Sequence, residues 1–184
     1  MQLLKSAVDF GVKQNRIGEC MENKLKNVKE WENALLNRSY LIMSVDRTEN
    51  SASVNKTLEN DFRALLKKDK VEFYEIDGVY DEPDVTERSF LIFTTDYQKM
   101  LAYKTSAGTI FKQESVLVHL PLWDGYDRAI LFYLNYEKKG TNEDLKGLTV
   151  RTFKFQKTYI SKVIGQNIYF AFGVDLKRRV MKRA

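Results

Sequence analysis

Polar side chains gather at the ends of apolar runs in the part of this sequence between residues 43 and 119. They are Ser44, Arg47, Asn50, Asn55, Tyr80, Glu87 and Gln113. Asn50 and Asn55 flank the expected start of a helix, where backbone N–H groups have no partner inside the helix. A ligand carboxylate or phosphate would bind well there. Tyr80 and Glu87 bracket a loop that can fold over a ligand. We therefore expect a small-molecule pocket, formed within one chain or across a subunit boundary.

Each of these residues also has an ordinary structural interpretation. Asn50 and Asn55 are common turn and cap residues, and Arg47 can form a surface ion pair with its neighbour Asp46. Tyr80 can simply pack its ring, and a glutamate at the start of a strand is usually solvated. The prediction of a pocket therefore depends on the order and spacing of the whole set.

Metal and disulfide chemistry are not expected. The chain has one cysteine, Cys20, and one histidine, His119. A zinc or iron site needs several thiolate, imidazole or carboxylate ligands, and a single cysteine cannot form an internal disulfide. His119 lies in the apolar run VLVHL and is interpreted as a buried sheet residue. No metal and no cofactor are therefore predicted.

The spacing of apolar residues predicts the helices and strands that carry these side chains. Apolar stripes at helical steps predict a helix over residues 20–36, a second one capped by Ser51 or Ser53, and a third from Asp96 to near Gly108. Short apolar runs between them predict strands, the first being a buried central strand at residues 39–45.

From residue 39 the order is strand, helix, strand, strand, helix, strand. This order is typical of an α+β ferredoxin-like fold, with an antiparallel sheet and two helices on one face. We expect a single domain over residues 1–184, with the ferredoxin-like core at 39–120, additional strands at 121–175 and a basic tail at 176–184. The additional strands should extend the sheet or reach a neighbouring subunit.

Composition limits the cellular context. No apolar run is long enough to cross a bilayer, and the first residues do not resemble a secretory signal, so a cytoplasmic protein without a membrane partner is expected. The net charge of +5 and the pI of about 9.1 are compatible with nucleic acid or an anionic small molecule as ligand. The basic tail is interpreted as a solvated end.

The order of the polar residues resembles that of the S-adenosylmethionine lyases of bacteriophages, formerly called S-adenosylmethionine hydrolases. The resemblance covers about residues 40–120, in the strings YLIMSVDRTENSASVNKTLENDFRALL, VEFYEIDGVYDEPDVTERSFLIF and FKQESVLVH. The family pattern has Ser and Arg after a strand, a polar residue opening a helix, a Gly-x-Tyr turn and a Glu before the next strand. The corresponding residues are Ser44, Arg47, Asn50, Asn55, Gly78, Tyr80, Glu87 and Gln113. The chain departs from the pattern at Val45 and Asp46, where the family more often has Ala and a bulky residue.

The resemblance implies cleavage of S-adenosylmethionine into 5′-methylthioadenosine and homoserine lactone, in a homotrimer with active sites between subunits. It implies that Glu87 and Tyr80 are catalytic. The other matched positions are expected to bind substrate, namely Ser44, Arg47, Asn50, Asn55 and Gln113. A phage-encoded enzyme of this kind would act in the host cytoplasm, where it would deprive methyltransferases and restriction systems of S-adenosylmethionine.

Three alternatives remain open at the level of sequence. The first is a lyase that acts on adenylated S-adenosylmethionine in CRISPR signalling. The second is a nucleic-acid binder, although strand 88–95, RSFLIFTT, lacks the glycine and aromatic spacing of an RNA-recognition motif. The third is a ferredoxin-like protein that binds a small molecule without converting it.

Overall fold

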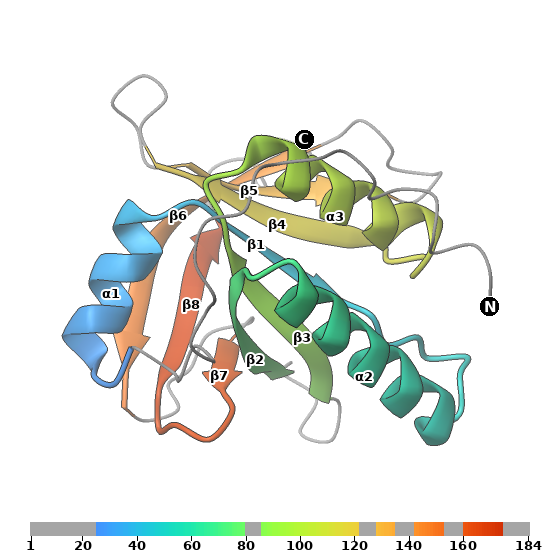
Figure 1. Cartoon of the computed structure of the whole chain (residues 1–184). Helices are drawn as coiled ribbons and strands as arrows, with labels where there is room; N and C mark the ends of the chain where they lie inside the picture. The colour runs from blue at the N-terminus through green and yellow to red at the C-terminus, as the bar shows by residue number, and fades with distance from the viewer. Residues whose placement is uncertain (1–24, 80–85, 122–127, 135–141, 153–159, 175–184) are drawn as a thin grey trace, which may run out of the picture.

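The computed structural model describes residues 25–79, 86–121, 128–134, 142–152 and 160–174. The helices of this part are α1 (Val28–Asn37), α2 (Ala52–Lys68) and α3 (Tyr97–Thr109). The strands are β1 (Tyr40–Ser44), β2 (Glu72–Val79), β3 (Thr86–Phe93), β4 (Ser115–Leu120), β5 (Arg128–Tyr133), β6 (Asn142–Arg151), β7 (Ile160–Val163) and β8 (Tyr169–Val174). Figure 1 shows their arrangement. The predicted α+β class is confirmed.

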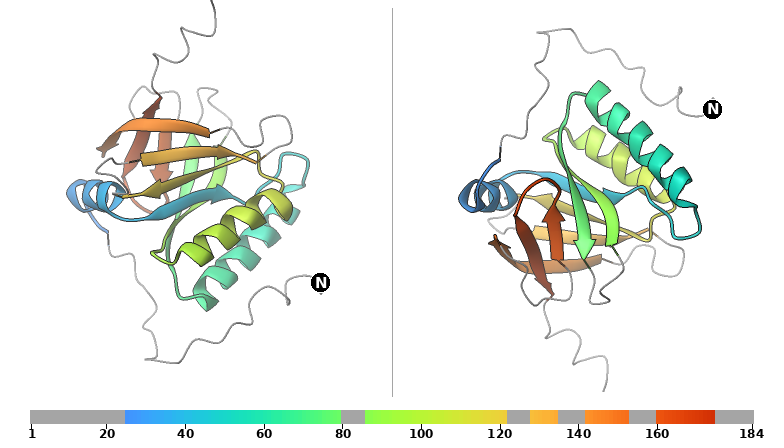
Figure 2. Two further views of the ribbon diagram at one scale, coloured as in Figure 1. Left: turned by 90° about the horizontal axis from the view of Figure 1, so that it is seen from above. Right: turned by 90° about the horizontal axis from the view of Figure 1, so that it is seen from below.

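The eight strands form one antiparallel sheet that curls into a barrel (Figure 2). Their order is β1-β3-β2-β7-β8-β6-β5-β4, and pairing between β1 and β4 closes the barrel. The strands β4, β1, β3 and β2 therefore lie next to one another in this order. The C-terminal strands β5 to β8 join the same sheet and pair with both of its edges, at β4 and β2. The sheet is consequently closed, whereas a four-stranded ferredoxin-like sheet is open.

Strand β1 is apolar on both of its faces because it lies between two cores. Leu41 and Met43 point to the side of the sheet that α2 and α3 cover, whereas Tyr40 points into the barrel. Its neighbours are β3 and β4. The prediction of a buried central strand is therefore confirmed.

Helices α2 and α3 cover the same outer face of the sheet, side by side (Figures 1 and 2). Phe62 of α2 packs edge-to-face on Phe90 of β3, with ring centroids 5.1 Å apart, and on Tyr103 of α3 at 6.1 Å. Ser51 caps α2 as predicted, because its hydroxyl accepts a hydrogen bond from the Val54 N–H. None of the described helices has both the length and the apolar character that crossing a membrane requires.

Helix α1 closes one end of the barrel. Its Trp31 is fully buried, packs edge-to-face on Tyr74 at 4.6 Å, and donates from Nε1 to Gln166 Oε1 at 2.9 Å. His119 lies near this end, stacked on Tyr40 at 4.7 Å, and its Nδ1 donates to a backbone carbonyl at 2.9 Å. The interpretation of His119 as a buried sheet residue is thus confirmed.

Some predicted features lie outside the described residues. The helix predicted from residue 20 is observed only from Val28, and residues 1–24 are not described. Cys20, Tyr80 and the basic tail at 176–184 also lie outside the described residues. The third helix, predicted to stop near Gly108, ends at Thr109.

Candidate functional site

A cavity of about 670 Å³ lies at the end of the barrel opposite α1. Its walls come from the end of β1 and the loop after it, the start of α2, the start of β3, the connection from α3 to β4, and β5. Six of the seven predicted site residues line it, namely Ser44, Arg47, Asn50, Asn55, Glu87 and Gln113. The structure thus brings these six together within a single chain, and Tyr80 lies outside the described residues.

Ser44 and Gln113 hold the backbone that follows β1. Ser44 is 4% exposed, and its hydroxyl donates to the Arg88 carbonyl at 2.7 Å and accepts from the Asp46 N–H at 3.1 Å. Gln113 donates from Nε2 to the Asp46 carbonyl at 2.7 Å. These two side chains therefore tie the end of β1 to β3 and to the segment before β4.

Asn50 and Asn55 shape the loop between β1 and α2. Asn55 Oδ1 accepts from the Arg47 N–H at 3.1 Å and from Asn50 Nδ2 at 3.0 Å, and its Nδ2 donates to the Arg47 carbonyl at 3.0 Å. The Asn50 N–H donates to the same carbonyl at 3.1 Å. The first turn of α2 thus fixes the loop that carries Arg47.

The Arg47 guanidinium forms an ion pair with Glu49. The alternative pairing with Asp46, considered from the sequence, is not observed. The pKa of the Glu49 carboxyl lies below its usual value, chiefly because a backbone N–H donates to it and also because Arg47 is close. Arg47 therefore stands at the rim of the cavity with a carboxylate beside it.

Glu87 lies near the start of β3 on the interior side of the sheet. Residues of one face alternate along a strand, and Leu91 and Phe93 belong to the interior core, so Glu87 and Ser89 share that face. The cross-strand partner of Glu87 is Gly78. Gly78 was expected in a turn and is instead within β2. Glycine has no side chain, so Gly78 contributes only backbone beside Glu87.

Asp46 also lines the cavity, although the sequence interpretation did not include it among the expected site residues. Its Oδ1 is buried and has no hydrogen-bond partner among the described residues. The pKa of the Asp46 carboxyl is raised to about 6, chiefly by burial and further by repulsion from Glu59 and Glu87. The sequence does carry a signal for Asp46, because side chains alternate between the two faces of a strand. Asp46 lies two residues beyond Ser44 and therefore follows the same face.

A network of ion pairs lies on the other face of β2 and β3, beneath α2. Arg63 binds Glu75 through Nε at 2.6 Å and through NH2 at 2.9 Å. Arg88 binds Asp77 at 3.0 Å and Glu75 at 3.2 Å. The hydrogen bonds from Arg63 are the main reason why the pKa of Glu75 is lowered. Arg88, which is next to Glu87 in the sequence, is thereby held on the outer side of the sheet.

The described residues include no group of three or more His, Cys, Asp or Glu side chains with the geometry of a metal site. The cavity instead combines carboxylates, amides, hydroxyls and cations around a partly apolar floor formed by residues such as Leu117 and Leu131. Such a lining suits an organic ligand that carries both charges and an apolar part.

The model of the S-adenosylmethionine lyase family matches residues 41–171, which is more than half of the chain. The chain belongs to the S-adenosylmethionine lyase family. The family match extends beyond residue 120, where the sequence resemblance stopped, and so includes most of the strands that complete the barrel. No curated protein matches the chain.

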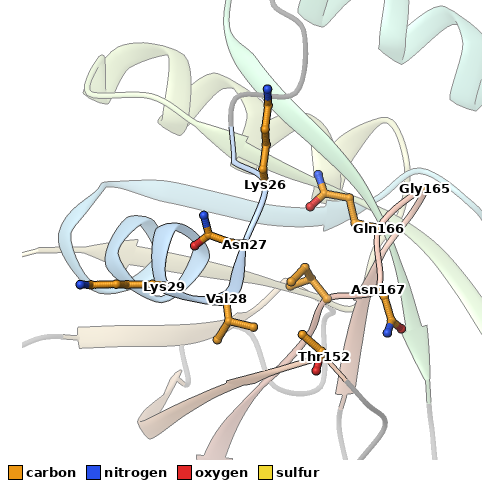
Figure 3. A pocket seen from close by; sticks show the side chains of 9 residues that line it. Lys26, Asn27, Val28, Lys29, Thr152, Gly165, Gln166 and Asn167 are labelled. Atoms are coloured by element: carbon orange, nitrogen blue, oxygen red, sulfur yellow. The ribbon is translucent and has the colours of Figure 1, made fainter.

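A second cavity, of about 810 Å³, lies where α1 begins, next to the turn between β7 and β8 (Figure 3). None of the predicted site residues lines it. Gln166, one of its lining residues, is already engaged, because it binds Trp31 and donates to the Leu25 carbonyl at 3.0 Å. The α1 side of this cavity precedes the region that the lyase family model matches. The residues that line the first cavity all lie within the matched region.

Proposed function

We propose that this chain cleaves S-adenosylmethionine into 5′-methylthioadenosine and homoserine lactone. One observation carries the proposal. In a member of the S-adenosylmethionine lyase family, a single cavity is lined by six residues that the sequence pattern singles out, and the carboxylate of Glu87 is one of them. The cavity offers side chains that suit a zwitterionic ligand with an additional positive charge.

The proposed reaction takes place within the substrate. A carboxylate oxygen of the methionine part attacks the carbon next to the sulfonium. A carbon–oxygen bond forms, the carbon–sulfur bond breaks, and its electron pair goes to sulfur, which leaves as a neutral thioether. The bond changes balance without a proton, an oxidant or a second reactant. The protein would chiefly hold the substrate in a folded conformation, which can be worth about 7–11 kcal/mol in favourable systems.

Glu87 and Tyr80 are proposed as the catalytic residues. The Glu87 carboxylate would balance the positive charge of the bound substrate in a site partly closed to water. Tyr80 would place a hydroxyl or a ring face near the sulfonium, where a cation–π contact is worth about 0.5–2 kcal/mol. Because the nucleophile and the leaving group both belong to the substrate, we propose that neither a metal nor a cofactor takes part.

The five remaining predicted residues are proposed to bind substrate or to hold the loop that does. Arg47 is the cation best placed to pair with an anionic group at the rim of the cavity. Ser44, Asn55 and Gln113 are engaged with backbone groups around Asp46 and Arg47. Their proposed contribution is thus mainly the shape of the cavity.

We also infer that the core of the barrel derives from a ferredoxin-like unit. The antiparallel order β4-β1-β3-β2, with α2 and α3 on one face, supports this description. The trimer with sites between subunits, the phage origin and the anti-restriction role remain proposals that rest on the family resemblance.

The test is incubation of the purified protein with S-adenosylmethionine, followed by mass analysis of the products. Wild-type protein should yield 5′-methylthioadenosine and homoserine lactone. Glu87→Gln should keep the fold and much of the binding and lose turnover, because the amide cannot balance the charge. Glu32→Gln, at an exposed position on α1, is the matched control. Unchanged product formation by Glu87→Gln would reject the role of Glu87.

Adenylated S-adenosylmethionine is the alternative substrate. Arg47 and Lys112 both line the cavity and could meet an additional phosphate. A comparison of kcat/KM for the two substrates decides between them. Binding of S-adenosylmethionine without any product would instead support a non-catalytic binder, and salt-sensitive RNA binding without turnover would support a nucleic-acid binder.

A further inference from the structure

Asp46 is a charged residue of the cavity to which the proposed mechanism gives no task. It lies two residues beyond the end of β1 and lines the cavity together with Glu87. Its Oδ1 is shielded from solvent and accepts no hydrogen bond from the described residues. A buried carboxylate oxygen without a donor is unfavourable. A ligand that brings a hydrogen-bond donor to this atom therefore gains free energy.

The backbone of Asp46 is fixed on both sides of its Cα. Its N–H donates to Ser44 Oγ at 3.1 Å, and its carbonyl accepts from Gln113 Nε2 at 2.7 Å. Neither contact uses the carboxylate. The backbone therefore fixes where the Asp46 side chain begins, while its Oδ1 stays available as an acceptor. A preorganised binding group requires this combination.

The charges that face Asp46 come from two elements. Helix α2 contributes Glu59 and Lys56, and strand β3 contributes Glu87 and Arg88. The Lys56 ammonium already pairs with Glu59 at 3.1 Å, and the Arg88 guanidinium is held by carboxylates of β2. The other charged residues that line the cavity are Arg47, Glu49, Lys112 and Glu114. Burial and the two acidic neighbours outweigh the attraction of the cations, so a ligand cation is favoured beside Asp46.

We propose that Asp46 binds the ammonium group of the substrate and thereby selects ligands that carry one. This inference rests on the proposed lyase function. An ammonium supplies both a positive charge and an N–H donor for the unpaired Oδ1, whereas a sulfonium has no N–H to donate. Asp46 then takes the ammonium, and Glu87 is left to balance the sulfonium end. Asp46 is in this view a specificity-determining residue.

The test uses two ligands that lack the sulfonium leaving group. S-adenosylhomocysteine retains the ammonium, and 5′-methylthioadenosine lacks it. Calorimetry at pH 7.5 should show that Asp46→Asn weakens S-adenosylhomocysteine binding by about 10- to 100-fold, the size expected for a hydrogen bond to a charged group. Binding of 5′-methylthioadenosine should change less than about twofold. Asp61→Asn, at an exposed position of α2, is the control.

The pH dependence gives a second readout. The pKa of Asp46 is raised to about 6, so the carboxylate is charged above this pH and neutral below it. Affinity of the wild type for S-adenosylhomocysteine should therefore fall as the pH drops through 6. In Asp46→Asn this part of the profile should be missing, which separates Asp46 from other groups that titrate in the same range.

Stability separates a binding role from a structural one. The pKa of Asp46 in the folded protein lies above the ordinary value of 3.8. The folded state therefore binds this proton more tightly and loses stability as the pH rises from 3.8 to about 6. At pH 7.5 the charged Asp46 destabilises the free protein, so Asp46→Asn should melt at or above the wild-type temperature.

The outcomes are distinct. Equal weakening of both ligands, no weakening of S-adenosylhomocysteine, or a lowered melting temperature would each overturn the role of Asp46. Wild-type protein that binds neither S-adenosylmethionine nor S-adenosylhomocysteine would contradict the lyase proposal itself. Cleavage of S-adenosylmethionine by the wild type, together with undiminished binding by Asp46→Asn, would overturn only the inference about Asp46.

Discussion

A polar side chain contributes to a site either by touching the ligand or by holding the backbone that does. Asn55 holds backbone at the cavity, because its amide makes three hydrogen bonds to the loop that carries Arg47. The sequence predicted that Asn55 belongs to the site. It could not predict this task, because the amide pairs with a backbone eight residues away whose path depends on the folded loop.

Asn55→Ala should open the loop between β1 and α2. Loss of the three hydrogen bonds should lower the free energy of unfolding by about 1–3 kcal/mol and raise KM more than it lowers kcat. Urea unfolding and steady-state kinetics measure the two effects. Asn33→Ala, at an exposed helical position of α1, should change stability by less than about 0.5 kcal/mol. An unaltered KM in Asn55→Ala would show that this loop does not shape the site.

Tyr80 can act through its hydroxyl or through its ring. Tyr80→Phe keeps the ring and removes the hydroxyl, whereas Tyr80→Ala removes both. If the hydroxyl is required, both variants should lose turnover, by about 10-fold or more for a lost hydrogen bond to a charged group. Product formation over time measures this. Full activity in Tyr80→Phe with loss in Tyr80→Ala would leave the ring alone as the functional part.

At the scale of elements, α2 is joined to the hairpin of β2 and β3 by charge as well as by apolar packing. Arg63 and Glu75 form a two-pronged pair, and Arg88 extends it to Asp77. The side chains of β2 and β3 that take part in this network point to the outer face of the sheet. Glu87 is next to Arg88 in the sequence and points to the inner face. The network therefore fixes the strand segment from which Glu87 projects.

Glu75→Gln should change how stability depends on pH. The pKa of Glu75 is lowered from 4.5, chiefly by hydrogen bonds from Arg63. Its charged form therefore stabilises the fold above pH 4.5, and this contribution is lost as the pH falls through the lowered pKa. Denaturation at pH 7 should show Glu75→Gln less stable by about 1.5–3 kcal/mol, with a smaller further loss on acidification. The exposed variant Glu32→Gln should follow the wild-type curve, and a wild-type acid response in Glu75→Gln would argue against the pair.

The helices and strands of the region 39–120 followed from local patterns. The continuous apolar run of β1 indicated burial on both faces, and Ser51 indicated the start of α2. Closure of the barrel did not follow, because it depends on pairing of β2 with β7, between residues about eighty positions apart. Gly78 was misplaced for the same reason, since a strand that continues past a glycine needs partners on both sides to be recognised.

At the scale of the whole molecule, the two ends of the barrel differ in character. Helix α1 seals one end with the fully buried Trp31 and Leu35. The other end holds serines, amides and charged groups around a cavity. Apolar packing and polar cavity residues are thus separated along the barrel axis, and substitutions at Trp31 should affect folding without altering ligand selectivity.

The assembly state can be tested directly. The family resemblance implies a homotrimer, so native mass spectrometry should show a species of three times the 21.5 kDa chain mass. Light scattering across a range of concentrations should give the same stoichiometry, and Glu87→Gln should preserve it. Full lyase activity in a preparation that is monomeric at assay concentration would contradict sites shared between subunits.

Every one of the eight strands has a hydrogen-bonded neighbour on each side. An exposed strand edge invites another chain to add its own strand, which is the common starting point of runaway fibril growth. The closed barrel leaves no such edge among the described strands. Among the described strands, open-ended pairing between copies is therefore disfavoured.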